Sequence, residues 1–414
     1  MAPPLKLFSI EGKSLKIDSA EDLEPHIGGL RAVEDVEEVR VMGNTLGVGA
    51  CKLLGEVLAT KKTLKVANLA DIFTGRLLNE IPEALSSLLT SILNLPNLTT
   101  INLNDNAFGL NTQAPLVAFL SSHVPLQHLY LNNNGLGPHA GILIADALSE
   151  LHSKKEAARK DGKEVSDLET VICGRNRLEN GSMTAWAKCF SLHNNVKIVK
   201  MVQNGIRQEG ISHLISEGLN HASSLEVLDL QDNTFTLLGA KALAAAAPGW
   251  TSIVELGVGD SLIGAKGGVL LASALSKGTN KKLQILRLQY NDINTKGLAA
   301  LAKTVKELPS LRKLELNGNK FSESDNAVTT LADIFEERKA RFEGDVIEED
   351  EWGLDELDEL ESDDEEEEDE EDVSPHERAE KLIQEAEEAQ EEPTVQIKDK
   401  QVDELAQKLK ETGI

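Results

Sequence analysis

The stretch LQHLYLNNNGLGP, residues 126–138, decides the fold of this chain. It contains the pattern L-x-x-L-x-L-x-x-N-x-L, in which leucines recur along a short run and an asparagine takes the ninth position. Leucines with this spacing are typical of a unit that joins a short strand to a helix and buries its leucines against neighbouring units. Asn134 takes the asparagine position, so Tyr130, Asn132 and Asn133 are the variable side chains that the unit offers outward.

The same pattern recurs ten times along the chain. Successive ninth positions are mostly 28 to 30 residues apart, at the upper end of the range for leucine-rich repeats. The sequence therefore predicts an α/β leucine-rich-repeat solenoid, a curved horseshoe or crescent with parallel β-strands on its concave face and helices on its convex face. The ninth positions, which we call the ladder positions, are Asn44, Ile72, Asn106, Asn134, Asn176, Asn204, Asn233, Ser261, Asn291 and Asn319.

Composition divides the chain into four predicted parts. Residues 1–30 form an N-terminal cap, and residues 31–343 form about ten or eleven repeats, including a terminal cap. Residues 345–372 hold 20 Asp or Glu and no Lys or Arg, so we predict that 344–372 is a disordered acidic tail with too little apolar surface to fold. Residues 373–414 form a charged segment that could contain a short helix.

Charge and composition exclude several classes of function. The net charge is −27, and residues 373–414 add 11 acidic and 6 basic residues to the acidic tail, which leaves the first 344 residues almost neutral. Nucleic acid needs a basic footprint, so a basic protein is the better partner.

No apolar run is long enough for a membrane span or a signal peptide. The three cysteines have no metal-ligand spacing, and we expect reduced core thiols in an intracellular monomer.

The residue before each ladder position is the candidate for partner contact. We expect the ladder asparagines to satisfy backbone groups where the chain leaves each strand, which is a structural role. No core position requires the preceding residue, so these side chains predict a polar stripe along the rim of the concave face. A rim that is merely solvated is the alternative. The preceding residues are Gly43, Asp71, Asp105, Asn133, Arg175, Gln203, Asp232, Asp260, Tyr290 and Gly318.

Two longer intervals break the period. The first lies in ANLADIFTGRLLNEIPEAL, where Ile72 replaces the ladder asparagine, Phe73 follows it, and Gly75 permits a turn that presents Arg76 from a loop. An ordinary surface arginine is the alternative. The second contains HSKKEAARKDGKEVSD, which we predict to be a solvated loop.

No catalytic motif occurs in the sequence. The chain has no phosphate-binding loop of the G-x-x-x-x-G-K-[ST] type, no G-x-S-x-G, no H-E-x-x-H and no C-x-x-C. His123 and His128 are the nearest histidine pair, and a surface residue and a turn residue explain them. The residues alone therefore predict a protein-binding solenoid without an active site of its own.

Five segments carry a more specific resemblance: DIFTGR at 71–76, NNGLGP at 133–138, ICGRNRLENGSM at 172–183, MVQNGIR at 201–207 and LDLQDNTF at 228–235. Together with the acidic tail, these segments resemble the Ran GTPase-activating protein family, and the resemblance follows the chain in order. The chain stops soon after the acidic tail, whereas animal members continue into a further folded domain, so it is similar to the fungal form.

The resemblance implies stimulation of GTP hydrolysis by Ran, the small GTPase that directs nucleocytoplasmic transport, and a cytoplasmic location. Ran supplies the nucleotide, the magnesium ion and the catalytic glutamine, so the activator needs no cofactor, and a Ran-binding accessory protein is an expected partner. In the family, the asparagine matching Asn133 holds Ran's glutamine. The arginine matching Arg76 matters for activity without entering the nucleotide site. For partner binding we predict Asp71, Phe73, Asp105, Asn132, Arg175, Asp232 and Asp260.

A stoichiometric binding protein is the alternative function. An inhibitor built from such repeats would be rich in cysteine, which this chain is not. An acidic chaperone that shields basic clients would use a shorter repeat. Acceleration of hydrolysis by catalytic amounts of the chain distinguishes activation from binding.

Overall fold

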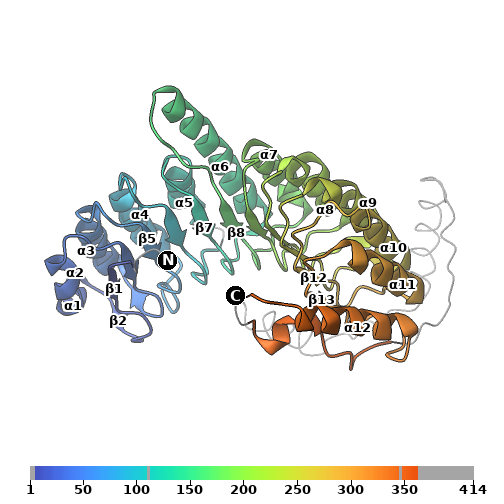
Figure 1. Cartoon of the computed structure of the whole chain (residues 1–414). Helices are drawn as coiled ribbons and strands as arrows, with labels where there is room; N and C mark the ends of the chain where they lie inside the picture. The colour runs from blue at the N-terminus through green and yellow to red at the C-terminus, as the bar shows by residue number, and fades with distance from the viewer. Residues whose placement is uncertain (1–4, 110–111, 345–346, 362–414) are drawn as a thin grey trace, which may run out of the picture. The chain divides into compact units, whose positions relative to one another are not determined.

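The computed structural model describes residues 5–109, 112–344 and 347–361. One sheet of twelve parallel strands organises this part of the chain, and its strands follow one another in sequence order. Helices lie along one face of this sheet (Figure 1). This arrangement confirms the predicted α/β leucine-rich-repeat solenoid.

The strands are short, and equivalent residues of neighbouring units pair with each other, as Ile101 pairs with Leu129 and Leu129 with Val171. A second, two-stranded sheet joins β2 (Lys16–Ile17) of the N-terminal cap to β4 (Thr45–Leu46) of the first repeat. The strands of the main sheet are β1 (Leu7–Ser9), β3 (Glu38–Arg40), β5 (Val66–Asn68), β6 (Thr100–Asn102), β7 (His128–Tyr130), β8 (Thr170–Ile172), β9 (Ile198–Lys200), β10 (Val227–Asp229), β11 (Glu255–Gly257), β12 (Ile285–Arg287), β13 (Lys313–Glu315) and β14 (Gly353–Leu354).

A helix or helical turn follows most strands. The α-helices are α1 (Ala20–Leu23), α2 (Gly28–Ala32), α3 (Val48–Ala59), α4 (Ile81–Ile92), α5 (Gln113–Leu120), α6 (Gly137–Lys160), α7 (Met183–Leu192), α8 (Gln208–His213), α9 (Thr236–Ala246), α10 (Gly264–Leu275), α11 (Thr295–Thr304) and α12 (Asn326–Ala340). Further helical turns of three to five residues, of the 3-10 or π type, are η1 (Glu24–His26), η2 (Asn180–Ser182), η3 (Leu214–Gly218), η4 (Leu219–His221), η5 (Ala247–Gly249), η6 (Val305–Glu307) and η7 (Glu349–Glu351).

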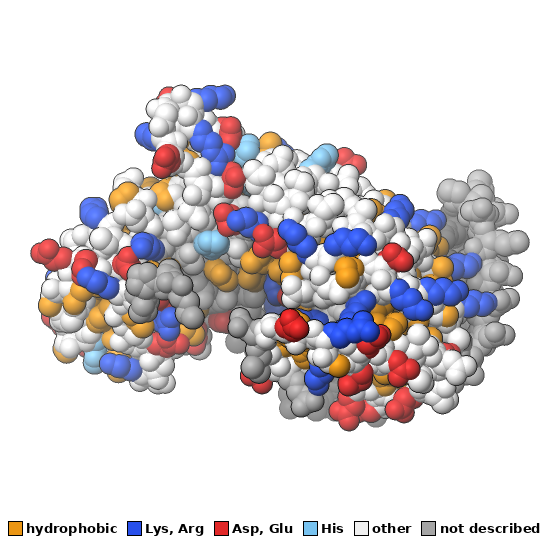
Figure 2. All heavy atoms as spheres, viewed as in Figure 1, with side chains coloured by type: hydrophobic (Ala, Val, Ile, Leu, Met, Phe, Trp, Pro, Cys, Tyr) orange, Lys and Arg blue, Asp and Glu red, His pale blue; other side chains and the backbone are white. Residues whose placement is uncertain are grey.

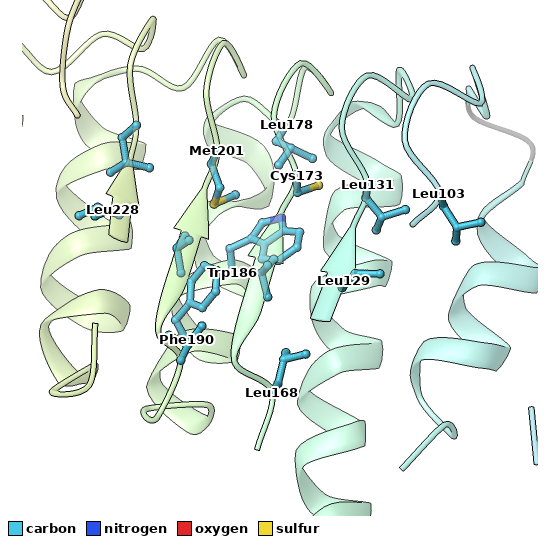
Figure 3. Close-up of a cluster of buried hydrophobic side chains, with 14 of the residues drawn as sticks. Leu103, Leu129, Leu131, Leu168, Cys173, Leu178, Trp186, Phe190, Met201 and Leu228 are labelled. Carbon is cyan, nitrogen blue, oxygen red and sulfur yellow. The ribbon is translucent and has the colours of Figure 1, made fainter. Parts of the chain in front are cut away.

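The core fills the space between the sheet and the helices. Leu129 and Leu131 from the β7 unit face the same layer as Trp186 and Phe190 of α7 (Figure 3). All three cysteines are buried and free, as predicted, and burial raises the pKa of the Cys51 thiol to about 12. Burial of the apolar residues at the repeated pattern positions, most of which are leucines, supplies the main favourable free energy of stacking.

The ladder asparagines join each unit to the next. The Nδ2 of Asn134 donates to the carbonyls of Leu103 and Leu131, both at 3.0 Å. Its Oδ1 accepts from the backbone N–H of Asn106 at 2.9 Å, and its own N–H donates to the Oδ1 of Asn176 at 3.0 Å. Equivalent bonds link most other units. The predicted ladder is therefore confirmed, and each amide satisfies buried backbone groups on two units.

The lysine-rich insertion is not a solvated loop, so this prediction is wrong. Helix α6 continues through it to Lys160. The side chain of Lys155 is buried, and its Nζ donates to the carbonyls of Val124, Leu126 and Ser166 at 2.7 to 2.8 Å. A lysine stem is long and apolar, so it can lie in a core when its ammonium group meets carbonyls. The insertion is thereby fixed to the preceding unit.

The start of the acidic tail is also predicted wrongly. Residues 347–361 continue the solenoid, because β14 pairs with β13 and Leu354, Leu357 and Leu360 pack against the core. The carboxylate of Asp355 accepts from the backbone N–H groups of Leu316 at 2.6 Å and Asn317 at 3.0 Å. The burial of these three leucines and the hydrogen bonds to Asp355 stabilise the folded segment despite its high negative charge. Residues 362–372 and the predicted segment 373–414 lie outside the described residues.

We predict that Asn134→Ala lowers the free energy of unfolding by about 2 kcal/mol or more, because buried carbonyl and N–H groups lose their partners. Urea denaturation measures the effect. Asn133→Gly is the matched control, since Asn133 is exposed and glycine adopts its backbone conformation without cost. Equal midpoints for wild type and Asn134→Ala would contradict the ladder's structural role.

We predict that Asp355→Ala destabilises the chain by about 1 to 2 kcal/mol, because two backbone N–H groups at the last sheet edge lose their acceptor. Glu356→Ala removes the same charge from an exposed position and should change the stability little. Thermal melting of both variants separates the hydrogen bonds from the charge. Identical melting temperatures would show that the segment does not stabilise the solenoid.

Candidate functional site

All ten residues that precede a ladder position share one backbone conformation. Their φ angles are positive and lie between 47° for Asp71 and 70° for Gly43. This region is unfavourable for most residues, and Gly, Asn and Asp tolerate it best. These three types occupy seven of the ten positions. The backbone therefore explains much of the polar character that the sequence analysis assigned to partner binding, and Arg175, Gln203 and Tyr290 are the residues it does not favour.

Asn133 is exposed at the rim with its amide oriented by one neighbour. Its backbone N–H donates to the carbonyl of Gly174 at 3.0 Å, which fixes the turn. Its Nδ2 donates to the Oδ1 of Asp105 in the preceding unit at 2.9 Å. A carboxylate can only accept, so this contact turns the amide oxygen of Asn133 away from Asp105. Within the described residues that oxygen has no donor, and it is available to a partner.

A polar hollow of about 610 Å³ extends from Asn133 along the rim. Arg175 and Arg177 bring positive charge to it, and Asp232 and Asp260 bring negative charge. Burial, followed by the charge of Asp260, raises the pKa of Asp232. Figure 2 likewise shows acidic and basic side chains interspersed over the face it presents. The complete lining is Asn133, Arg175, Arg177, Gln203, Gly205, Asp232, Asn233, Thr234, Asp260 and Leu262.

The other predicted contact residues differ in their availability. Asp71 is half-buried and accepts from the hydroxyl of Thr74, and Asp105 is exposed. Asn132 is half-buried, and its amide oxygen accepts from the N–H of Gly174, so it holds the next unit. Phe73 is 2% exposed and lies against Phe108 with ring centroids 6.3 Å apart. The prediction that Phe73 contacts a partner is wrong, because its ring fills the core.

Arg76 is held against the N-terminal cap instead of being presented from its loop, and its side chain is only 8% exposed. Its Nε donates to the hydroxyl of Thr45 at 3.0 Å, and its Nη2 donates to the carbonyls of Thr45 at 2.8 Å and Ile17 at 3.0 Å. Asp18 completes the set through an ion pair with Nη1. With its donors engaged in this way, the guanidinium joins the second unit to the cap and to the first unit, and the expectation of an outward-presented arginine is wrong.

Sequence reasoning missed four residues of the hollow, and each of them directly follows a ladder position: Arg177, Gly205, Thr234 and Leu262. The φ angles of Arg177 and Leu262 are positive, 55° and 53°. Leu262 is also 53% exposed, although leucine is unfavourable in this conformation. The residue after each ladder position, examined across the units in the same way as the residue before it, would have identified them.

The remaining chemistry of the described residues is limited. None of their His, Cys, Asp and Glu side chains form a group of three or more that could hold a metal ion. In the same part of the chain, every helix is too short or too polar to cross a membrane. His123 is buried, with its ring nitrogens 2.7 Å and 2.6 Å from the carbonyls of Leu93 and Leu98, and burial lowers its pKa. It is a core residue.

Comparison with known proteins gives both a repeat and a family. A family model described as Leucine Rich repeat matches residues 221–244 and 279–302. Ran GTPase-activating protein 1 of Xenopus laevis is 42% identical over 202 residues, which cover 48% of this chain and 34% of the relative. The Ran GTPase-activating protein of Drosophila melanogaster is 34% identical over 319 residues, covering 76% of this chain and 52% of that protein.

The yeast relative covers most of both chains. Ran GTPase-activating protein 1 of Saccharomyces cerevisiae is 38% identical over 343 residues, which represent 80% of this chain and 83% of the yeast protein. The aligned length is therefore too large to reflect a shared repeat alone. On this similarity, the chain belongs to the Ran GTPase-activating protein family.

Proposed function

We propose that this chain stimulates GTP hydrolysis by the small GTPase Ran and supports nucleocytoplasmic transport in this way. Its relatives from yeast, frog and fly carry the name of Ran GTPase-activating proteins. The single observation that carries the mechanism is the geometry of Asn133, an exposed residue whose amide nitrogen donates to Asp105 and whose amide oxygen has no donor within the described residues. The rim around it is the docking surface.

The chemistry of two amides explains how Asn133 acts. Hydrolysis in small GTPases depends on the position of the attacking water, which a glutamine of the GTPase orients. Because Asp105 already accepts from Nδ2, the Oδ1 of Asn133 is the atom that accepts from the amide N–H of that glutamine. The glutamine oxygen then remains free to accept from water. Asn133 thus limits the glutamine to one orientation, and Asp105 is the residue that positions Asn133.

The environment of Arg76 supports activation without an arginine finger. In other GTPase systems such a finger contributes a rate factor of roughly 10³ to 10⁵ by stabilising charge on the phosphoryl group. Arg76 would have to give up its contacts with Ile17, Asp18 and Thr45 to reach a phosphate. We therefore assign Arg76 a supporting role in docking. Nucleotide and magnesium belong to Ran, and the chain itself binds no cofactor.

The charge pattern of the hollow supports the choice of partner-binding residues. Arg175, Asp232 and Asp260 line one hollow with Asn133, so a partner that meets Asn133 also meets both signs of charge. Complementary charges contribute mainly to partner specificity and to the rate of association. We place the activity in the cytoplasm, on a monomer, with a Ran-binding accessory protein as a further partner. Stoichiometric binding without activation remains the alternative function, and it predicts no turnover.

We predict that Asn133→Gly slows stimulated hydrolysis about tenfold to a hundredfold, because a hydrogen bond worth about 1 to 3 kcal/mol is lost from the reacting complex. Glycine is chosen because it keeps the positive φ of 55° without strain. Single-turnover hydrolysis of Ran-bound GTP at saturating activator measures the maximal rate. Asn97→Ala is the control. It removes an exposed amide that precedes β6, at the N-terminal ends of the strands, and it should retain the wild-type rate. A wild-type rate for Asn133→Gly would exclude the proposed role.

We predict that a chain ending at residue 361 associates with Ran more slowly than the full chain at low ionic strength. The deleted residues 362–414 contain 21 acidic and 6 basic residues, and long-range attraction of a basic partner is screened by salt. Stopped-flow association at low and high salt tests this, and the two chains should become equal at high salt. Equal association rates of the two chains at low salt would show that residues 362–414 do not steer the association with Ran.

A further inference from the structure

We infer that Leu77 and Leu78, which directly follow Arg76, form an apolar contact through which the chain docks on the GTPase, and that Arg76 is the positioning residue that holds them outward. The inference rests on the proposed function and deepens it. It gives Arg76 a role that is consistent with its contacts to Ile17, Asp18 and Thr45 and does not require it to reach the nucleotide.

The exposure of this pair is unusual for the molecule. Leu77 is 64% exposed and Leu78 is 62% exposed, the largest values among the large hydrophobic side chains of the described residues. Single exposed leucines are common on protein surfaces and need no explanation. Two adjacent leucines that are both largely exposed leave apolar surface in water, and a partner that covers them would gain the free energy of burying it.

The loop that carries the pair is not needed for stacking. The interval between the ladder positions Ile72 and Asn106 is 34 residues, compared with 28 between Asn106 and Asn134. The extra residues lie between β5 and α4, and buried side chains anchor both ends, since Phe73 and Ile81 are each 2% exposed. The leucines between these anchors could have been polar without any loss of packing.

Arg76 fixes the conformation of this loop from within. Its guanidinium reaches back to Ile17, Asp18 and Thr45, as described above. The loop also closes on itself, because the N–H of Arg76 donates to Phe73 at 3.0 Å and the N–H of Glu80 donates to Leu77 at 3.0 Å. A loop that is already ordered loses little conformational entropy on binding, so its apolar contact contributes more to affinity.

The loop and Asn133 lie on the same side of the sheet, at the C-terminal ends of its strands. Asp71, at the start of the loop, is the rim residue of its unit and has the same left-handed backbone as Asn133. Strands β5, β6 and β7 are consecutive neighbours in the sheet (Figure 1). Neighbouring strands are about 4.8 Å apart, so the two units are separated by about 10 Å at the level of the strands. A partner that places its glutamine against Asn133 is therefore close enough to reach the loop that carries the leucine pair, and we take this partner to be the GTPase.

The test uses the full chain with Leu77→Ser and Leu78→Ser combined. Single-turnover hydrolysis of Ran-bound GTP is measured at increasing concentrations of the chain. We expect the half-saturating concentration to rise about tenfold or more, because the apolar contact is lost, while the maximal rate stays within about twofold of wild type. Asn133→Gly has the opposite pattern, a lower maximal rate. Leu238→Ser, on a 43% exposed leucine of helix α9, is the matched control and should change neither value.

Variants of Arg76 test its positioning role. Arg76→Ala should raise the half-saturating concentration as the leucine double variant does, and it should add little in combination with that variant, because both act on one contact. Hydrogen exchange of the amides in residues 72–80 should accelerate in Arg76→Ala and not in the leucine variant. Arg76→Lys retains the positive charge but loses the planar set of guanidinium N–H donors. Its affinity for the GTPase should therefore lie between those of Arg76→Ala and wild type.

The outcomes separate this inference from the proposed function. If wild type accelerates hydrolysis and the leucine double variant has an unchanged half-saturating concentration, the inference is wrong while the proposed function stands. If catalytic amounts of wild type do not accelerate hydrolysis, both fail. The leucine pair could instead contact a second copy of the chain, and analytical ultracentrifugation tests this. If the wild type forms a dimer that the leucine double variant loses, and the half-saturating concentration is unchanged, the inference is also wrong.

Discussion

The hydrogen bonds of the ladder asparagines are the constraint on which the rest of the structure depends. Each strand of the main sheet is at most three residues long, so the backbone must turn away from the sheet almost at once. A buried turn leaves carbonyl and N–H groups without partners unless a side chain supplies them. Asn134 and its equivalents supply them on two units at once, which fixes the register of one unit on the next.

The same turn creates the rim on which the candidate site lies. To bring the ladder amide inward, the residue before it takes a positive φ, and its side chain is placed at the edge of the sheet. Gly, Asn and Asp are frequent there because they tolerate this backbone. Asn133 satisfies the backbone requirement and also carries an amide that Asp105 orients. A residue type selected for conformation has thus become available for recognition, and neighbouring rim residues supply charge of both signs.

Periodicity made most of the fold predictable from the sequence. The recurring leucines and ladder asparagines identified the solenoid, its units, the structural role of Asn134 and the exposed position of Asn133, because each signal repeats. Features that occur once were missed. The buried ammonium group of Lys155 donates to three carbonyls that only the folded chain brings together. The carboxylate of Asp355 accepts from two backbone N–H groups next to β13, and no local sequence pattern predicts this contact. Phe73 and Arg76 were expected at the surface because the longer interval and the turn at Gly75 indicated a loop that presents its side chains outward, whereas contacts with distant residues bury both.

The central claim is that the amide of Asn133 holds the catalytic glutamine of Ran. A crystal structure of the chain with Ran, GDP and a transition-state analogue of the phosphoryl group tests this most directly. We expect the Oδ1 of Asn133 to lie within hydrogen-bond distance, about 2.9 Å, of the glutamine amide nitrogen. We also expect Arg76 to remain on Ile17, Asp18 and Thr45. A glutamine that makes no contact with Asn133, or a guanidinium of Arg76 on the phosphoryl analogue, would contradict this account.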